Sequence, residues 1–231
     1  MDRQAGPQFR DRGQAGALLG EHLVERGMGS GSIVLGLLRG GIPVAAALAA
    51  RLGAPLGALA VRKLGVPQQE EVAFGAVASY RSCRGRYLVR TVHQHVLGSR
   101  AKAVLEEVES RATAELDRLA RRFADYAPDI TGAKVVLCDD GLATGATMHA
   151  AVDVAAQCGA QEVIVAVPVA PRVLARSMAG ASSVVCLLAP REFSAVGSHY
   201  EDFWQVDEDA VERLLLEARE ARGQHDARES N

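Results

Sequence analysis

Aromatic residues and unbalanced charge are both scarce in this chain. Phenylalanine, tyrosine and tryptophan make up 4% of the 231 residues, and the formal net charge is −2. A nearly neutral chain without a basic stripe gives no electrostatic footprint for nucleic acid. No apolar run approaches the length of a membrane span, and residues 1–12 lack the apolar region of a signal peptide. We therefore expect a cytoplasmic protein with neither a nucleic-acid nor a membrane partner.

Motifs for metal, redox and dinucleotide chemistry are also missing. The four cysteines form no CxxC pair, so we expect them to be buried and reduced in a reducing cytosol. His93 and His95 form an HxH pattern with no third ligand near it in the sequence. The glycines of residues 27–32 lack GxGxxG spacing and precede a strand, which argues against a dinucleotide-binding fingerprint.

The length and composition fit one soluble α/β domain with an appendage. A chain of 231 residues can bury a sizeable core, and 48% hydrophobic with 23% charged residues is ordinary for a globular protein. We assign residues 1–222 to a single domain. The polar residues 223–231 are expected to form a disordered tail.

The stretch KVVLCDDGLATGATMH, residues 134–149, is the most informative part of the sequence. Its apolar start predicts a strand buried on both faces of a parallel sheet. Asp139 and Asp140 follow that strand, and a small, hydroxyl-rich loop then leads into a helix. Backbone N–H groups at such a helix start bind anions. The paired carboxylates would repel a bare phosphate, so the ligand is expected to carry hydroxyl groups or a metal as well.

A second junction of the same kind follows the first predicted strand, residues 32–38. Arg39, Gly40 and Gly41 precede a helix rich in small residues, and two glycines allow a ligand to approach the backbone closely. A guanidinium beside helix N–H groups suits another anionic group. The strand at residues 56–61 ends in the basic pair Arg62 and Lys63, also where open α/β sheets bind ligands.

These motifs resemble those of the type I phosphoribosyltransferases. The two acids followed by a loop that ends T-G-x-T resemble the family signature, and LRGGIPVA resembles its pyrophosphate loop. The block VRKLGVP followed by E-x-A-x-G-A is similar to a bacterial subgroup, sometimes fused to hydrolase domains, whose acceptor is generally unassigned. The resemblance implies an α/β fold with a central parallel sheet flanked by helices, a β-hairpin flap, an inserted long helix and a C-terminal hood.

The resemblance also implies a donor, 5-phosphoribosyl 1-diphosphate (PRPP), with Mg²⁺ as the cofactor. Asp139 and Asp140 would accept hydrogen bonds from the ribose hydroxyls and contact the metal mostly through PRPP and water. Arg39, Gly40, Gly41 and Lys63 would hold the pyrophosphate. The 5′-phosphate would lie on the loop made of Gly141, Leu142, Ala143, Thr144, Gly145, Ala146 and Thr147.

The flap and the hood are predicted from two further regions. Strands at 72–79 and 87–92, joined by residues 80–85, suggest the hairpin, and a helix over 99–126 has one apolar stripe. Flap and inserted helix together span about residues 65–128. That stripe packs on the domain or on a second subunit, so a homodimer is one expected arrangement. The hood, about residues 190–205, offers four residues to the acceptor: Phe193, Val196, Tyr200 and Phe203.

Ala143 limits the choice of acceptor. The 6-oxopurine salvage enzymes usually carry an aspartate at this point of the loop, so alanine argues against a hypoxanthine–guanine enzyme. Glu71 in the flap is our candidate for a general acid or base. The resulting hypothesis is a Mg²⁺-dependent transferase of nucleotide salvage that moves the phosphoribosyl group to a small nitrogenous base. The alternative is a PRPP-binding sensor or regulator without catalysis.

Overall fold

The protein is built around one seven-stranded sheet. The computed structural model describes residues 8–66, 69–89 and 101–229, with side chains for all of these but 66, 69–72, 101–105 and 225–229. The strand order is β4-β3-β2-β1-β5-β6-β7. The strands are β1 (Ser32–Leu38), β2 (Leu56–Val66), β3 (Gln69–Tyr80), β4 (Cys83–Leu88), β5 (Lys134–Cys138), β6 (Glu162–Val169) and β7 (Ser183–Leu188). Among the described strands, only the pairings of β3, with β2 and with β4, are antiparallel, which confirms the expected α/β fold with a mainly parallel sheet.

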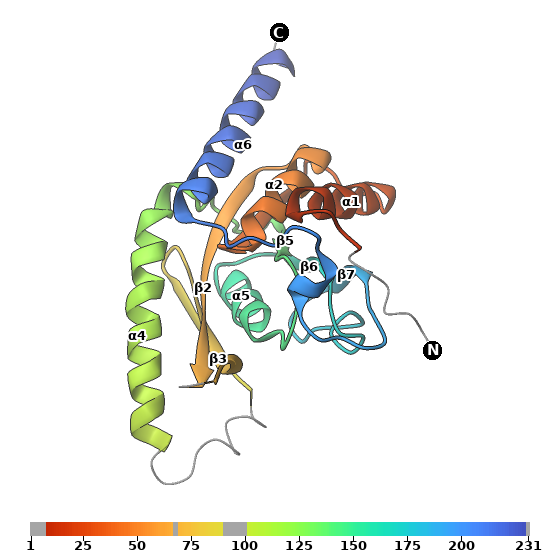
Figure 1. The fold of residues 1–231 in the computed structure, drawn as a ribbon. Coiled ribbons are helices and arrows are strands. Elements are labelled where there is room, and N and C mark those ends of the chain that lie inside the picture. The colour runs from red at the N-terminus through yellow and green to blue at the C-terminus, as the bar shows by residue number, and fades with distance from the viewer. Residues whose placement is uncertain (1–7, 67–68, 90–100, 230–231) are drawn as a thin grey trace.

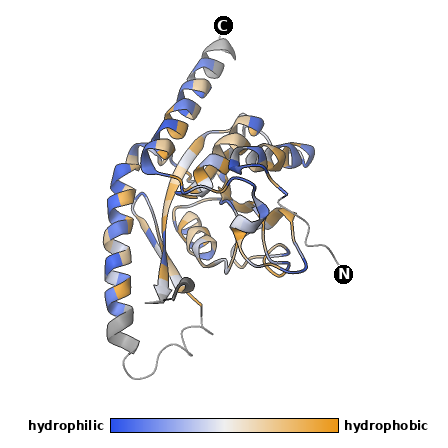
Figure 2. Cartoon of the chain, viewed as in Figure 1, coloured by the Kyte–Doolittle hydropathy of each residue, from blue (hydrophilic) through white to orange (hydrophobic). Residues whose placement is uncertain are grey.

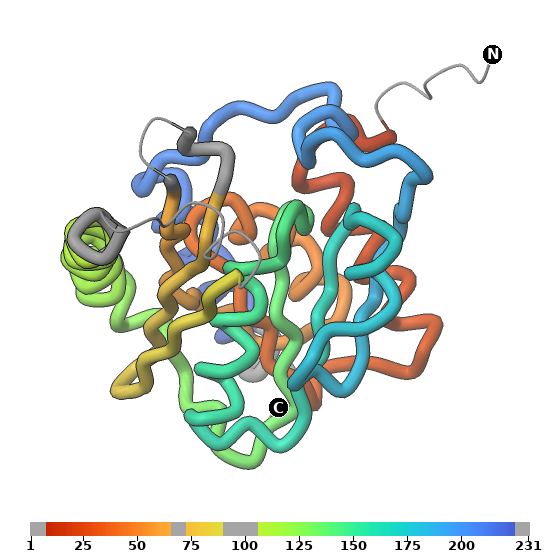
Figure 3. Tube along the Cα trace, turned by 90° about the horizontal axis from the view of Figure 1, so that it is seen from below, coloured from red at the N-terminus to blue at the C-terminus, as the bar shows by residue number. Residues whose placement is uncertain are grey.

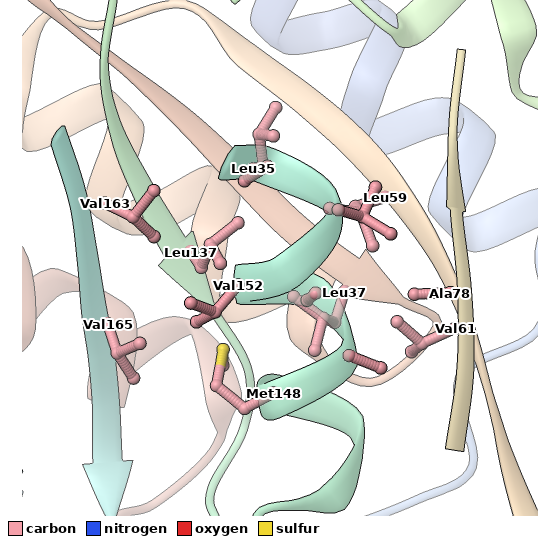
Figure 4. Close-up of a cluster of buried hydrophobic side chains, with 14 of the residues drawn as sticks. Leu35, Leu37, Leu59, Val61, Ala78, Leu137, Met148, Val152, Val163 and Val165 are labelled. Carbon is pink, nitrogen blue, oxygen red and sulfur yellow. The ribbon is translucent and has the colours of Figure 1, made fainter. Parts of the chain in front are cut away.

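Helices cover both faces of the sheet (Figure 1). The α-helices are α1 (Arg12–Glu25), α2 (Gly41–Leu52), α4 (Ala101–Arg122), α5 (Ala146–Gln157) and α6 (Glu208–Glu229), and Ala124–Tyr126 and Val196–His199 form 3₁₀ turns. Met148 and Val152 of α5 pack on Leu137, Val163 and Val165 on one face (Figure 4). The other four α-helices in the described part of the chain cover the opposite face. Along β1 and β5 the side chains alternate between the two faces, as a strand buried on both faces requires.

The point where the chain changes direction across the sheet lies between β1 and β5. From β1 the chain passes through α2 to β2, on one side, whereas from β5 it passes through α5 to β6, on the other. β1 and β5 are parallel neighbours, with Gly36 opposite Cys138. Ligands of open α/β sheets bind in the crevice that such a reversal leaves at the carboxyl ends of the strands.

The hairpin beside α4 has a shorter loop than the sequence predicted. β3 and β4 are joined through Arg81 and Ser82, so the second strand begins at Cys83 and not at Tyr87. The predicted loop over 80–85 was wrong because Cys83 to Gly85 pair with Ala78 to Tyr80 in the ladder. Helix α4 packs its apolar stripe on this side of the sheet, and its outer side is hydrophilic (Figure 2).

Two segments complete the C-terminal half of the chain. Residues 171–179 form turns, in which the backbone N–H groups of Leu174 and Ala175 both donate to the carbonyl oxygen of Pro171. Residues 223–229, expected to be disordered, continue α6 as far as Glu229. The Glu, Ala and Arg residues of this segment have high helix propensity, which outweighs the cost of Gly223 within the helix. Among the described helices, none is long and apolar enough to cross a membrane.

Cys83 and Cys158 form a disulfide, contrary to the expectation of reduced cysteines. The bond joins β4 to the end of α5, across 75 residues of sequence, with the two Cα atoms 6.0 Å apart. Gly85 explains why the elements approach so closely, because a Cβ there would lie 2.5 Å from Val154 of α5. Cys138 and Cys186 are free thiols.

An ion-pair cluster attaches the start of α6 to the end of α4. Glu208 accepts hydrogen bonds from Arg118 at 2.5 Å and 2.9 Å and from Arg122 at 3.0 Å. The hydrogen bonds from Arg118, together with the charges of Arg118, Arg122 and Arg39, lower the pKa of Glu208 to about 2 from its ordinary value of 4.5. Since the folded-state pKa is depressed, the stabilisation is complete above pH 4.5 and is lost as the pH falls towards 2.

We predict that Glu208→Gln lowers the stability at pH 7 by about 1 kcal/mol, because Arg118 is half exposed and solvent screens the pair. This corresponds to about 2–4 °C in unfolding temperature. Thermal scans between pH 7 and pH 3 should show the difference from the wild type shrinking below pH 4.5. Glu220→Gln, an exposed change on the same helix, is the control and should change little. A difference that does not vary with pH would contradict the prediction.

Candidate active site at the carboxyl edge of the sheet

The loops that follow β1 and β5 meet at one edge of the sheet. Parallel pairing of the two strands carries Arg39–Gly41 and Asp139–Gly145 out at the same edge. A Cβ on Gly40 would lie 2.5 Å from Oδ2 of Asp140, and one on Gly41 would lie 2.6 Å from the carbonyl oxygen of Cys138. Glycine is therefore needed at both positions for the loops to be in contact. The two halves of the predicted site form one continuous surface.

The acidic pair is half-buried at the centre of this surface. The backbone N–H of Asp140 donates to Oδ1 of Asp139 at 2.9 Å. Burial raises the pKa of Asp139 well above its ordinary value, and the negative charge of Asp140 raises it further. Burial also raises the pKa of Asp140, although the charge of Arg12 and its hydrogen bond oppose that effect. Two crowded carboxylates favour ligands that bring protons or positive charge to them.

The predicted basic residues differ in their surroundings. Lys63 is exposed, and its charge favours the ionised form of both aspartates, so its ammonium group lies near the acidic pair. Its neighbour Arg62 turns instead to Glu115 of α4, at 2.7 Å. Arg39 is half-buried after β1, and its charge reaches Glu208 at the start of α6. Lys63 and Arg39 are therefore available to bind an anionic ligand, whereas Arg62 forms an ion pair that joins β2 to α4.

The loop that follows the acids ends at the first turn of α5. Gly145 precedes the helix with φ of 74°, in the left-handed region where glycine is favoured, and it has no side chain to cap the helix. The hydroxyl of Thr144 accepts from the N–H of Ala146 at 3.4 Å. The first N–H groups of a helix have no partners within the helix, so they are available to an anion. Thr144 is exposed and Thr147 is half-buried, and both hydroxyl groups lie on this turn. Leu142, Gly145 and Ala146 are buried, and Ala143 is exposed.

The hood is formed by two segments that are far apart in sequence. Phe9 forms a β-bridge with Tyr200, and backbone hydrogen bonds join residues 8–10 to residues 199–202. In Figure 3 the first coloured residues of the chain, in red, and the blue hood segment lie together. The sequence predicted only the C-terminal part of this arrangement.

The four predicted hood residues have different environments. Tyr200 is buried, and its hydroxyl donates to the carbonyl oxygen of Asp140 at 2.6 Å. The ring of Phe203 lies under the guanidinium of Arg12, 3.7 Å from the ring centroid. Phe193 stacks on His199 with ring centroids 5.7 Å apart, and Val196 packs against Gly141. Tyr200 and Phe203 are therefore occupied by internal contacts, and Phe193 and Val196 remain half-exposed.

Two residues of this region were not among the predicted site residues. Arg12 pairs with Asp140, and no local motif could have indicated a partner so distant in the sequence. Trp204 is 80% exposed and follows Phe203 directly. As the single tryptophan in a segment already predicted to be the hood, it carried a signal that the prediction did not use.

Some predictions fall outside what the structure describes. The backbone of Glu71 lies in β3, but its side chain is outside the described residues, as are His93 and His95. Among the described side chains, no group of three or more histidine, cysteine or acidic residues is arranged to hold a metal. Asp139 and Asp140 are the two acidic residues that the loop after β5 brings to this edge of the sheet.

Comparisons with known proteins agree on one family. A family model described as "Phosphoribosyl transferase domain" matches residues 15–187. The Mycobacterium tuberculosis H37Rv protein named "Putative phosphoribosyl transferase Rv0571c" is 44% identical over 213 residues, which are 90% of this chain and 46% of that protein. The homologue from strain CDC 1551, named "Putative phosphoribosyl transferase MT0597", has the same identity and the same coverage of both chains. The chain thus spans about half the length of the curated relatives that it matches.

A solved structure supports the same fold. The crystal structure of TT1426 from Thermus thermophilus has 40% sequence identity to this chain and a TM-score of 0.68. The match covers 91% of this chain and 98% of that one. Similarity over nearly the whole of both chains shows that they share the same overall fold.

Proposed function

This chain belongs to the phosphoribosyl transferase domain family, and on that premise we propose that it transfers the 5-phosphoribosyl group of PRPP to a small nitrogenous base and releases pyrophosphate. One observation carries the proposal. A carboxylate pair, a helix start preceded by glycine and a loop of glycines beside two cations converge on one edge of the sheet. PRPP carries a ribose diol, a 5′-phosphate and a pyrophosphate. These groups match the carboxylate pair, the helix start and the glycine loop with its two cations, in that order.

The proposed roles follow from the position of each group. Asp139 and Asp140 accept hydrogen bonds from the ribose hydroxyls, and the first turn of α5 with Thr144 and Thr147 binds the 5′-phosphate. Arg39 and Lys63 bind the pyrophosphate, which Gly40 and Gly41 allow close to the backbone. Their fixed positive charges stabilise the pyrophosphate as it leaves with additional negative charge.

Mg²⁺ is the proposed cofactor. Two carboxylates and the oxygens of a pyrophosphate are the hard oxygen ligands that this ion prefers, with water completing its octahedral shell. Two acids alone make a poor cage for the ion, so PRPP would bring most of its ligands. The ion would supply additional neutralisation of the leaving pyrophosphate.

The decisive experiment is incubation with PRPP, Mg²⁺ and a panel of purine and pyrimidine bases, with pyrophosphate release measured. We expect release with one class of base, and 6-oxopurines are the least favoured because Ala143 supplies no carboxylate from the loop. Tight PRPP binding without release in the presence of any base would favour the alternative, a PRPP sensor.

Trp204 is the aromatic side chain that we propose contacts the acceptor. Its backbone carbonyl accepts from Arg12 at 2.9 Å, which holds this residue beside the acidic pair, and its side chain is 80% exposed. An exposed indole next to a ligand site can stack on a base, at about 1–3 kcal/mol for each base stacked.

We predict that Trp204→Ala raises the KM for the acceptor about tenfold and leaves PRPP affinity within about twofold. Steady-state kinetics with the base identified by the panel, together with PRPP calorimetry, would measure both. Val173→Ala, which truncates another exposed apolar side chain, is the control. Equal loss of PRPP affinity would mean that Trp204 supports the site as a whole and does not contact the base.

A further inference from the structure

Arg12 lies at a position that helix stability does not explain. It is the first residue of α1, directly after Asp11, whose carboxylate caps the helix by accepting from the N–H of Gln14 at 2.7 Å. A cation in the first turn opposes the helix dipole, so local electrostatics disfavour arginine there. The side chain is nevertheless only 11% exposed, and it points away from solvent toward the loop after β5.

The guanidinium of Arg12 is held by three different groups. Nε and Nη2 contact the same carboxylate oxygen of Asp140, Oδ2, at 2.9 Å and 2.8 Å. Nη1 donates to the carbonyl oxygen of Trp204 at 2.9 Å. The flat face of the group lies on the ring of Phe203, at 3.7 Å from the centroid. Arginine suits this place because its planar fork combines several donors with a stacking face.

This arrangement fixes Asp140 from two directions. Arg12 holds the side chain of Asp140, while the hydroxyl of Tyr200 holds its backbone carbonyl at 2.6 Å. Arg12 begins α1, close after residues 8–10, and Tyr200 lies within residues 199–202. Backbone hydrogen bonds join these two hood segments. Because both guanidinium contacts go to Oδ2, Arg12 leaves the second oxygen, Oδ1, for another donor.

We infer that Arg12 is a positioning residue, which orients the carboxylate of Asp140 toward the ribose hydroxyls of the donor and links that carboxylate to the hood. The inference rests on the proposed function, since it concerns the ribose part of the same site. A buried ion pair is weak evidence for a role in stability, because the cost of removing two charges from water offsets much of their attraction. An oriented carboxylate, in contrast, improves binding by removing the entropy cost of ordering it.

The test compares two ligands that differ in the ribose. Wild-type protein and the variants Arg12→Met and Arg12→Lys are titrated with ribose 5-phosphate and with inorganic phosphate, and binding is followed by NMR chemical shifts. Methionine keeps the apolar contact with Phe203 but removes the charge and the donors. Arg10→Met is the matched control, since Arg10 lies on the same segment, is 67% exposed and pairs with Asp11 and not with Asp140.

We expect Arg12→Met to bind ribose 5-phosphate about tenfold more weakly and inorganic phosphate as the wild type does. Arg12→Lys should lie between the two, because it keeps the charge and loses the fork, and Arg10→Met should match the wild type. If Arg12→Met does not fold, Arg12→Lys still tests the inference.

Two results would overturn the inference while leaving the proposed function intact. One is equal or tighter binding of ribose 5-phosphate by the Arg12 variants. The other is an equal loss for both ligands, which would indicate a general structural role. If the wild type binds neither ligand, the proposed function fails, and the inference fails with it.

Discussion

Replacing both acids, Asp139→Asn together with Asp140→Asn, is expected to abolish Mg²⁺-dependent binding of PRPP. The change removes two charges and two acceptors from the centre of the site, and each amide presents a donor where the ribose hydroxyls need an acceptor. We expect a loss on the order of 100-fold or more, equivalent to about 2.7 kcal/mol. Isothermal titration calorimetry with PRPP and Mg²⁺ measures it directly.

The single variants should separate the two acids by their effect on stability. The pKa of Asp139 is raised by burial and by Asp140, so its ionisation at neutral pH costs folding free energy. Since the folded-state pKa is above the ordinary value, that cost appears as the pH rises above about 4. Asp139→Asn should therefore raise the unfolding temperature at pH 7. Asp140→Asn should lower it, because the largely buried guanidinium of Arg12 loses its charged partner.

The control for the acidic pair is Asp153→Asn, an exposed aspartate on α5. It should leave both PRPP binding and unfolding temperature within error of the wild type. Undiminished PRPP binding by the double variant, with circular dichroism showing a folded protein, would contradict the proposed role of the acids.

The second large effect is expected for Arg39→Met and Lys63→Met. Both remove a positive charge from the half of the site assigned to pyrophosphate, where charge develops as the leaving group departs. Loss of one such electrostatic contact typically reduces the rate about 10²–10³-fold. We therefore expect the pyrophosphate release rate to fall by this factor in each variant and PRPP affinity to fall about tenfold.

Ribose 5-phosphate distinguishes this effect from general damage to the site. It lacks pyrophosphate, so both variants should bind it as the wild type does. Lys134→Met is the matched control, because Lys134 lies at the start of β5, at the opposite edge of the sheet, and pairs with Glu162 at 3.0 Å. Equal weakening of ribose 5-phosphate and PRPP would show that these cations do not act on the pyrophosphate.

Local patterns in the sequence were enough to predict the elements that build the centre of the site. The apolar run Val135 to Leu137, the acids and the small-residue loop each indicate their own conformation within a few residues. Parallel pairing then follows from the alternation of strands and helices. The contact between Gly40 and Asp140 follows from that pairing, so one continuous site was within reach of the sequence.

Other features depend on contacts that a sequence pattern does not carry. The pairing of Arg12 with Asp140 joins distant parts of the chain, and Arg12 itself resembles any charged residue at a helix start. The register of β4 depends on its packing against α5 at Gly85, which also brings Cys83 to Cys158. The aromatic hood residues were predicted as acceptor contacts from their chemistry alone, and the internal contacts of two of them became visible only with the hood in place.

The claim that one ligand spans both loops is tested most directly by competition calorimetry. PRPP with Mg²⁺ is titrated into the protein alone, then into protein saturated with ribose 5-phosphate, and then into protein saturated with pyrophosphate. We predict that PRPP binds the free protein at a single site and that each fragment separately lowers its apparent affinity, because one occupies the loop after β5 and the other the loop after β1. PRPP binding that neither fragment weakens, or no PRPP binding at all, would contradict a single bipartite site.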